Sequence, residues 1–181
     1  TPGMLPPWES MRWYPHVALY GDGRLITLGP QIDLYPGPAL PNLQVTHFSQ
    51  HAVEQALTWA AEAGLRGEDR QLGPMILDAG ELLFTVTSPA GTHRTSVTDI
   101  SLDDPAINVL RELQDVLTSL ATWLPEHVAS EAAPFQFDRL RVISFPADPN
   151  SLPDPLFASV VDWPLESDLA TLGASWSEPA Q

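Results

Sequence analysis

The chain has 181 residues, 44 % of them apolar, and a net charge of −15 from 23 acidic and 8 basic residues. This length suits one domain whose core is large enough to be stable without disulfides or metals. Every basic residue is Arg, and a strongly negative surface repels nucleic acid, so we expect no nucleic-acid partner. The lack of Cys excludes disulfides and thiolate chemistry. No apolar stretch has the roughly 20 residues of a membrane span.

The 19 Pro residues are concentrated in residues 2–15, 30–41 and 146–164. Because Pro removes a backbone donor and fixes φ, such segments are neither helices nor central strands. We therefore predict an extended Pro-rich lead-in at 1–15, a core domain at 16–145, and a Pro-rich C-terminal arm at 146–181 that is partly docked through its apolar residues.

Two apolar runs, Val17–Tyr20 and Arg24–Leu28, flank Gly21-Asp22-Gly23. An Asp-Gly step between apolar runs predicts a β-hairpin, because both residues tolerate positive φ. The Pro/Gly-rich residues 29–43 follow as a stiff loop, and Gln44–Phe48 is expected to be a short third strand.

The first helix is expected at about residues 50–63, where Ala, Val and Leu recur at helical spacing. Ser49 is the predicted N-cap, with its hydroxyl accepting a hydrogen bond from an amide of the first turn. Gly64 is the predicted C′ residue that ends the helix.

A second hairpin is predicted from Glu81–Thr87 and Thr92–Ile100, joined by Ser88-Pro89-Ala90-Gly91, because Pro at the second turn position and Gly at the fourth suit a type I turn. The second helix is expected to begin after the N-cap Asp104, with Pro at its first position, and to continue to Leu124.

A final strand is predicted at Leu140–Phe145, before Pro146. The expected fold is therefore α+β: an antiparallel sheet built from two hairpins plus single strands, with two amphipathic helices on one face.

Several side chains are candidates for catalysis or metal binding. His47 and His51 have the i, i+4 spacing of metal ligands, but the expected N-cap at Ser49 leaves His47 outside the helix. Ser88 and Ser96 lie near His93, without the Gly-x-Ser-x-Gly motif of a hydrolase. We therefore predict no catalytic residue, no metal and no cofactor.

The Pro-rich loop at 30–41 carries the predicted binding residues: Tyr35 as an anchor, supported by Leu34 and Ile32. A stiff loop loses little entropy on binding, so its aromatic and aliphatic side chains are good anchors. The same side chains would also serve to seal the loop onto the core, and both alternatives stay open.

The chain resembles a group of actinobacterial secreted proteins and lipoproteins of uncharacterised function. The resemblance spans about residues 17–172 and lies in four stretches: Leu19-Tyr20-Gly21-Asp22-Gly23-Arg24, Tyr35-Pro36-Gly37-Pro38, Ala63-Gly64-Leu65 and Val161-Asp162-Trp163-Pro164-Leu165. It implies an extracellular or cell-surface protein with an N-terminal lipid anchor outside this chain, and it implies no known activity. The pattern of hairpins and helices also resembles emfourin-type inhibitors of metalloproteases, with no reactive-site residue to carry over.

The sequence thus predicts an exported, non-enzymatic binding module that engages a protein or a small ligand through its stiff loops, with protease inhibition as one form of that function. Two alternatives remain: a hydrolase with an unrecognised Ser/His/Asp site, and a structural cell-surface protein that associates with its neighbours.

Overall fold

The structure is a computed structural model that describes residues 14–31, 40–76, 80–139 and 166. Its contacts divide the chain into two units: residues 1–31 with 39–136, and residues 32–38 with 137–181. All of the helices and strands described below belong to the first unit. The described residues of the second unit, 137–139 and 166, carry no helix or strand.

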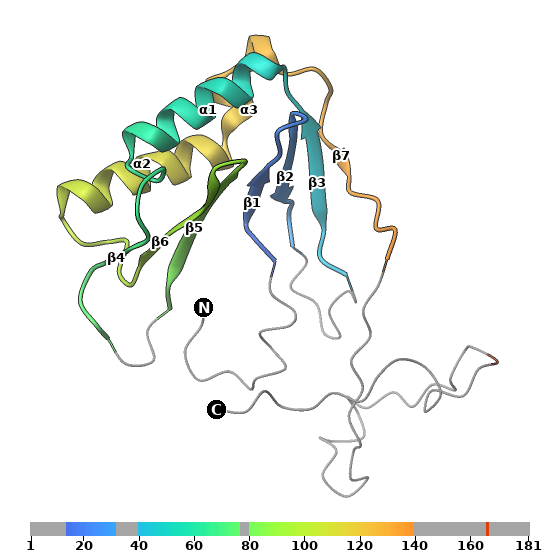
Figure 1. Cartoon of the computed structure of the whole chain (residues 1–181). Coiled ribbons are helices and arrows are strands. Elements are labelled where there is room, and N and C mark those ends of the chain that lie inside the picture. Colours follow the sequence, from blue (N-terminus) through green and yellow to red (C-terminus); the bar gives the residue numbers. More distant parts are fainter. Residues whose placement is uncertain (1–13, 32–39, 77–79, 140–165, 167–181) are drawn as a thin grey trace, which may run out of the picture. The chain divides into compact units, whose positions relative to one another are not determined.

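Four strands form an antiparallel sheet in the order β1-β2-β3-β7 (Figure 1). These strands are β1 (Val17–Leu19), β2 (Arg24–Leu28), β3 (Leu43–His47) and β7 (Ala133–Pro134). The central pair β2–β3 is in register from Arg24 opposite His47 to Leu28 opposite Leu43. The predicted third strand is confirmed, with bounds one residue earlier, and β7 is an addition that the sequence did not indicate.

A second sheet has the order β4-β6-β5. Its strands are β4 (Arg70–Leu72), β5 (Leu82–Ser88) and β6 (Gly91–Val97). β5 and β6 form the predicted antiparallel hairpin, whereas β4 pairs with β6 in parallel. The α+β class is therefore confirmed, with its strands divided between two sheets.

Both hairpin turns are where the sequence places them. In the first, Gly23 N donates to Tyr20 O at 3.0 Å and Tyr20 N donates to Arg24 O at 2.8 Å, closing a three-residue loop. Gly23 has a positive φ of 89°, a conformation that favours Gly. In the second, Ser88 lies opposite Gly91 in the ladder, and the Ser88 hydroxyl accepts from Ala90 N at 3.2 Å.

Helix α1 (Gln50–Glu62) begins after Ser49, as predicted, but the predicted hydroxyl cap is wrong. The Ser49 side chain makes no hydrogen bond to the first turn, because its Oγ pairs with His127 Nδ1 at 3.1 Å. The C-terminus follows the prediction: Gly64 has a φ of 75°, and Leu65 N donates to Ala60 O at 2.9 Å.

Helix α2 (Pro105–Thr118) is capped by Asp104, whose carboxylate accepts from Ala106 N at 2.8 Å and from Ile107 N at 3.3 Å. The predicted continuation to Leu124 is interrupted at Ser119, where φ is −122° and ψ is 30°. The hydroxyls of Thr118 and Ser119 both donate to Asp115 O, and such back-bonding competes with regular helix. The short α3 (Leu120–Trp123) and the 3-10 turn η2 (Pro125–His127) follow.

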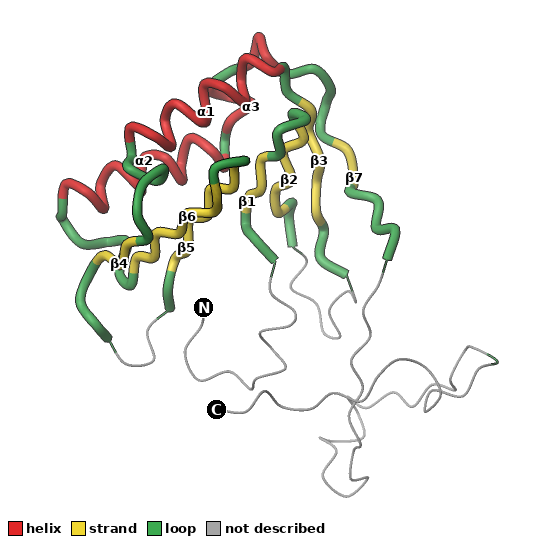
Figure 2. Tube along the Cα trace, in the orientation of Figure 1, coloured by secondary structure: helices red, strands yellow, loops and turns green. Residues whose placement is uncertain are grey.

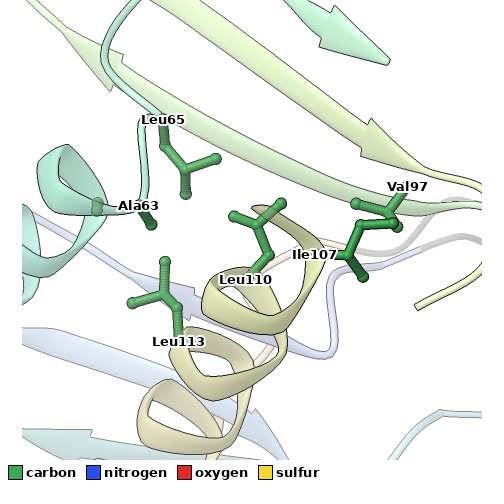
Figure 3. Close-up of a cluster of buried hydrophobic side chains, with 7 residues drawn as sticks. Ala63, Leu65, Val97, Ile107, Leu110 and Leu113 are labelled. Atoms are coloured by element: carbon green, nitrogen blue, oxygen red, sulfur yellow. The ribbon is translucent and has the colours of Figure 1, made fainter. Parts of the chain in front are cut away.

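Helices α1 and α2 lie side by side (Figure 2) and share a buried apolar cluster with the second sheet. Its buried members are Ala60, Ala63, Leu65, Val97, Ile107, Leu110 and Leu113. Figure 3 shows Ile107 beside Val97, and Leu110 near Leu65. A second cluster joins α1 and α3 to the first sheet through Leu25, Phe48, Ala52 and Leu120. Trp59 packs against both clusters, so α1 connects them.

The predicted final strand at Leu140–Phe145 lies outside the described residues, as do almost all of the lead-in at 1–15 and of the arm at 146–181. The domain boundaries at residues 16 and 145 therefore stay predictions.

Candidate functional site

The predicted binding residues Ile32, Leu34 and Tyr35 lie in residues 32–39, outside the described part of the chain. The structure describes the two points at which this loop leaves and rejoins the first sheet. Gly29 N donates to Asn42 O at 2.8 Å, and Asn42 Nδ2 donates to Pro30 O at 2.9 Å. The loop thus joins β2 to β3 at a base closed by hydrogen bonds, and its role in binding stays a prediction.

A groove of about 400 Å³ lies between α1, α2 and α3 and is the strongest candidate site in the described residues. A cavity of roughly 300–1,000 Å³ with mostly apolar walls is typical of a ligand site. Its lining consists of Trp59, Glu62, Ala63, Val109, Glu112, Leu113, Asp115, Val116 and Trp123.

The apolar surface of the groove comes from helix positions that turn toward each other. Leu113 and Ala63 are buried, with 4 % and 8 % of their surface exposed, so they lie at its floor. Val109 and Trp123 are 42 % and 59 % exposed, so they form the accessible apolar part of the lining. The groove therefore has accessible apolar side chains at its walls and buried core residues at its floor.

Three carboxylates stand among these apolar side chains. Glu62 comes from α1, and Glu112 and Asp115 come from α2; all three residues are exposed. The lining contains no Arg or His. The groove thus combines apolar walls with negative charge contributed from both of its long sides.

No cation of the described residues is placed to neutralise this charge by an ion pair. The ion pairs there are Arg24 with Asp22 and His127 with Glu126, and neither lies in the lining. Arg111, on the same helix as Glu112, directs its guanidinium to Ile100 O and Leu102 O, where it makes three hydrogen bonds of 2.7–2.9 Å. The groove carboxylates are therefore available to a cationic ligand.

The sequence predicts that the second helix is amphipathic, and Leu113 and Val116 lie on its apolar face, but it does not indicate the groove. Val109 and Trp123 are apolar residues outside the buried face of their helices, and such extra apolar residues are the one feature of the sequence that could have indicated a binding surface. The pairing of α1 with α2 joins residues about 50 positions apart, and periodicity within one helix does not indicate it.

The serine and histidine pairs considered from the sequence are separated. Ser88 is engaged in the turn, with its hydroxyl in contact with Gly91 O and Ala90 N. Ser96 and His93 are three positions apart on β6, so they point to opposite faces of the sheet.

A different Ser–His pair is formed by Ser49 and His127. His127 Nδ1 lies 3.1 Å from Ser49 Oγ, and its Nε2 lies 3.7 Å from Glu126 Oε1, beyond a hydrogen bond. Glu126 is largely exposed, with 65 % of its side chain accessible. The pair links η2 to the start of α1, reinforced by Ser49 N donating to His127 O at 2.8 Å.

The histidine pair considered for metal binding is also divided. His47 ends β3 and its Nδ1 lies 3.2 Å from Ser130 Oγ, whereas the ring of His51 lies 4.8 Å from that of His127. The prediction that His47 lies outside the helix is confirmed. Within the described ranges, no three His, Asp or Glu side chains are grouped as a metal site would need.

Two exposed carboxyls have pKa values below the usual 3.8. The backbone amide of Arg24 is the largest cause for Asp22, and the Arg24 side chain adds to it. The hydroxyl of Ser101 is the largest cause for Asp99, followed by the Ser101 amide. Both carboxylates therefore organise turns, at a distance in sequence from the groove residues.

None of the helices in the described ranges combines the length and apolar character that crossing a bilayer requires. Comparison of the chain with models of protein families, with curated proteins and with solved structures finds no match in any of the three.

Proposed function

We propose that the chain is a non-enzymatic binding module that takes an apolar part of its ligand into the groove between α1, α2 and α3. The observation that carries this proposal is the exposed Trp123, 59 % accessible, at the edge of a cavity of about 400 Å³. Burying exposed aromatic and aliphatic surface is the main source of binding free energy, and Trp is enriched among the residues that contribute most.

The Pro-rich loop at 30–41 is a second contact in this proposal, with Tyr35 as its anchor and Leu34 and Ile32 in support. Its hydrogen-bonded base at Gly29 and Asn42 supports the idea of a stiff loop. Export to the cell surface is part of the same proposal and is supported by the resemblance of four stretches of the sequence to actinobacterial secreted proteins.

The test compares the full chain with variants as bait for extracellular and envelope proteins. The baits are wild type, Trp123→Ala, Tyr35→Ala and the control Leu83→Ala, in which an exposed apolar residue outside the groove is shortened. Proteins retained by wild type would be identified by mass spectrometry, and the dissociation constant of each purified candidate would then be measured.

A groove ligand should bind Trp123→Ala about tenfold or more weakly, because truncating a Trp that a ligand covers typically has an effect of this size, and Leu83→Ala should bind like wild type. A ligand weakened by Tyr35→Ala instead would place the contact on the loop. Equal binding by all four baits would contradict a contact at the groove and a contact at the loop. Self-association of the chain, measured by sedimentation, would favour the structural alternative.

A further inference from the structure

We infer that the groove between α1 and α2 accepts a basic amphipathic segment of a protein partner, in which Lys or Arg side chains flank a row of large apolar side chains. This inference rests on the proposed function, because it names the class of ligand for that same groove. It is carried by the combination of an apolar floor and wall with carboxylates on both sides.

The carboxylates select the charge of the ligand. Glu62 stands on α1, and Glu112 and Asp115 stand on α2. A cation lying between the helices is therefore attracted from both sides, with the modest strength that exposed carboxylates provide. An anionic segment would meet repulsion at each of these positions, so the groove discriminates against it.

The C-terminal arm of this chain does not carry the required charge. Residues 142–181 contain no Arg and no Lys, so the C-terminal arm is acidic and is repelled by the groove. A second copy of the chain carries the same net charge of −15. Both occupants are disfavoured by electrostatics, which leaves a separate basic partner.

The apolar spacing on α2 favours a helical partner. Val109, Leu113 and Val116 follow each other at i, i+4 and i+7 and span about 10 Å at 1.5 Å per residue. A helix with apolar residues at the same spacing presents a row of equal length, and docking an amphipathic helix into a groove is a recurring mode of recognition.

The experiment uses the full chain and four synthetic peptides of equal length. The first is an amphipathic helix of Leu and Lys, the second and third replace every Lys by Gln or by Glu, and the fourth scrambles the first so that its charge is kept and its apolar face is lost. Calorimetry measures the dissociation constants at about 50 and 300 mM NaCl, because screening acts on the charge contribution.

Two sets of variants separate groove charge from net charge. Glu62→Gln/Glu112→Gln/Asp115→Asn neutralises the lining carboxylates, and Glu54→Gln/Glu68→Gln/Glu131→Gln removes the same charge at exposed positions outside the lining. Trp123→Ala reports on the apolar contact alone.

We expect the Lys peptide to bind wild type about tenfold more tightly than the Gln peptide, from several charge pairs of modest strength. The groove triple variant should remove this difference, and the control triple variant should keep most of it. The scrambled and Glu peptides should bind more weakly than the Gln peptide or not at all.

Two results would overturn the inference while leaving groove binding intact: equal binding of the Lys and Gln peptides with both weakened by Trp123→Ala, or equal losses in the two triple variants. If Trp123→Ala changes the binding of neither peptide, the groove is not the site and the proposed function itself is contradicted.

Discussion

Gly23 is the residue at which the first turn meets the segment before α1. Its φ is 89°, and a Cβ there would overlap the carbonyl oxygen of Phe48. Phe48 N donates to Gly23 O at 2.8 Å, so the two backbones cannot separate without losing that bond. We expect Gly23→Ala to lower the free energy of unfolding by roughly 2–4 kcal/mol, measured by urea denaturation.

The matched control for this change is Gly21→Ala in the same turn, where a Cβ meets no atom within 4 Å. Its loss should stay below about 1 kcal/mol. Equal losses for the two variants would show that the close approach at Phe48 carries no special cost.

Asp22 and Asp99 make stability depend on pH at the acidic end. Their folded-state pKa values lie below 3.8 because Arg24 and Ser101 donate hydrogen bonds to them. A carboxyl with a lowered pKa contributes stability that is present above its unfolded pKa and is lost as pH falls through the folded value. We therefore expect a loss of stability below about pH 3.8.

Carbon-detected NMR titration of the carboxyl groups measures these pKa values directly. Ser101→Ala should raise the pKa of Asp99 toward 3.8 and leave that of Asp22 unchanged, because the two turns have separate donors. An Asp99 pKa that does not move in the variant would contradict the assigned cause.

The start of α2 is capped by a side chain that accepts hydrogen bonds from two amides of the first turn. Asp104 accepts from the amides of Ala106 and Ile107, two of the donors that a helix leaves without an internal partner. Asp104→Ala should lower the free energy of unfolding by about 1 kcal/mol. The control Asp103→Ala removes an equal charge and one side-chain contact, to Asn108, so thermal denaturation should show a smaller loss.

Elements whose signal is local could be predicted from the sequence. The turns at Gly23 and Gly91, the cap at Asp104 and the stop at Gly64 each depend on a few neighbouring residues, and the structure has all four. Ser49 was predicted wrongly because its hydroxyl pairs with His127, 78 positions later.

Elements that depend on distant partners were missed. β4 has three residues and β7 has two, too few for a period to be recognised. Each is a strand because β6 or β3 lies beside it, and that pairing is a property of the folded chain. The break at Ser119 was missed because the apolar stripe continues to Leu120, while the hydroxyl bonds of residues 118 and 119 interrupt the helix.

At the scale of the molecule, the candidate groove was the hardest feature to predict. Its helices were expected, but its lining requires that Trp59 of α1 meet Val109 of α2 and Trp123 of α3. Hydrophobic periodicity indicates that each helix has an apolar face, and it does not indicate which side chains remain open once those faces are joined. The loop residues were predicted from the stiffness of a Pro-rich segment, and they lie outside the described residues.

The two apolar clusters should unfold together, because α1 contributes to both and Trp59 packs against each. Leu110 and Leu120 are both fully buried, one in each cluster. We expect Leu110→Ala and Leu120→Ala each to lower the free energy of unfolding by roughly 2–5 kcal/mol, against less than about 1 kcal/mol for the exposed Leu83→Ala.

Amide hydrogen exchange of β2 and β6 would follow one strand from each sheet through urea denaturation. Coincident transitions in every variant would establish one cooperative core, since loss of either cluster then removes the support of the other through α1. Protection lost in β6 but kept in β2 of Leu110→Ala would instead mean that the sheets are separate folding units, and that the groove helices can loosen while the first sheet stays intact.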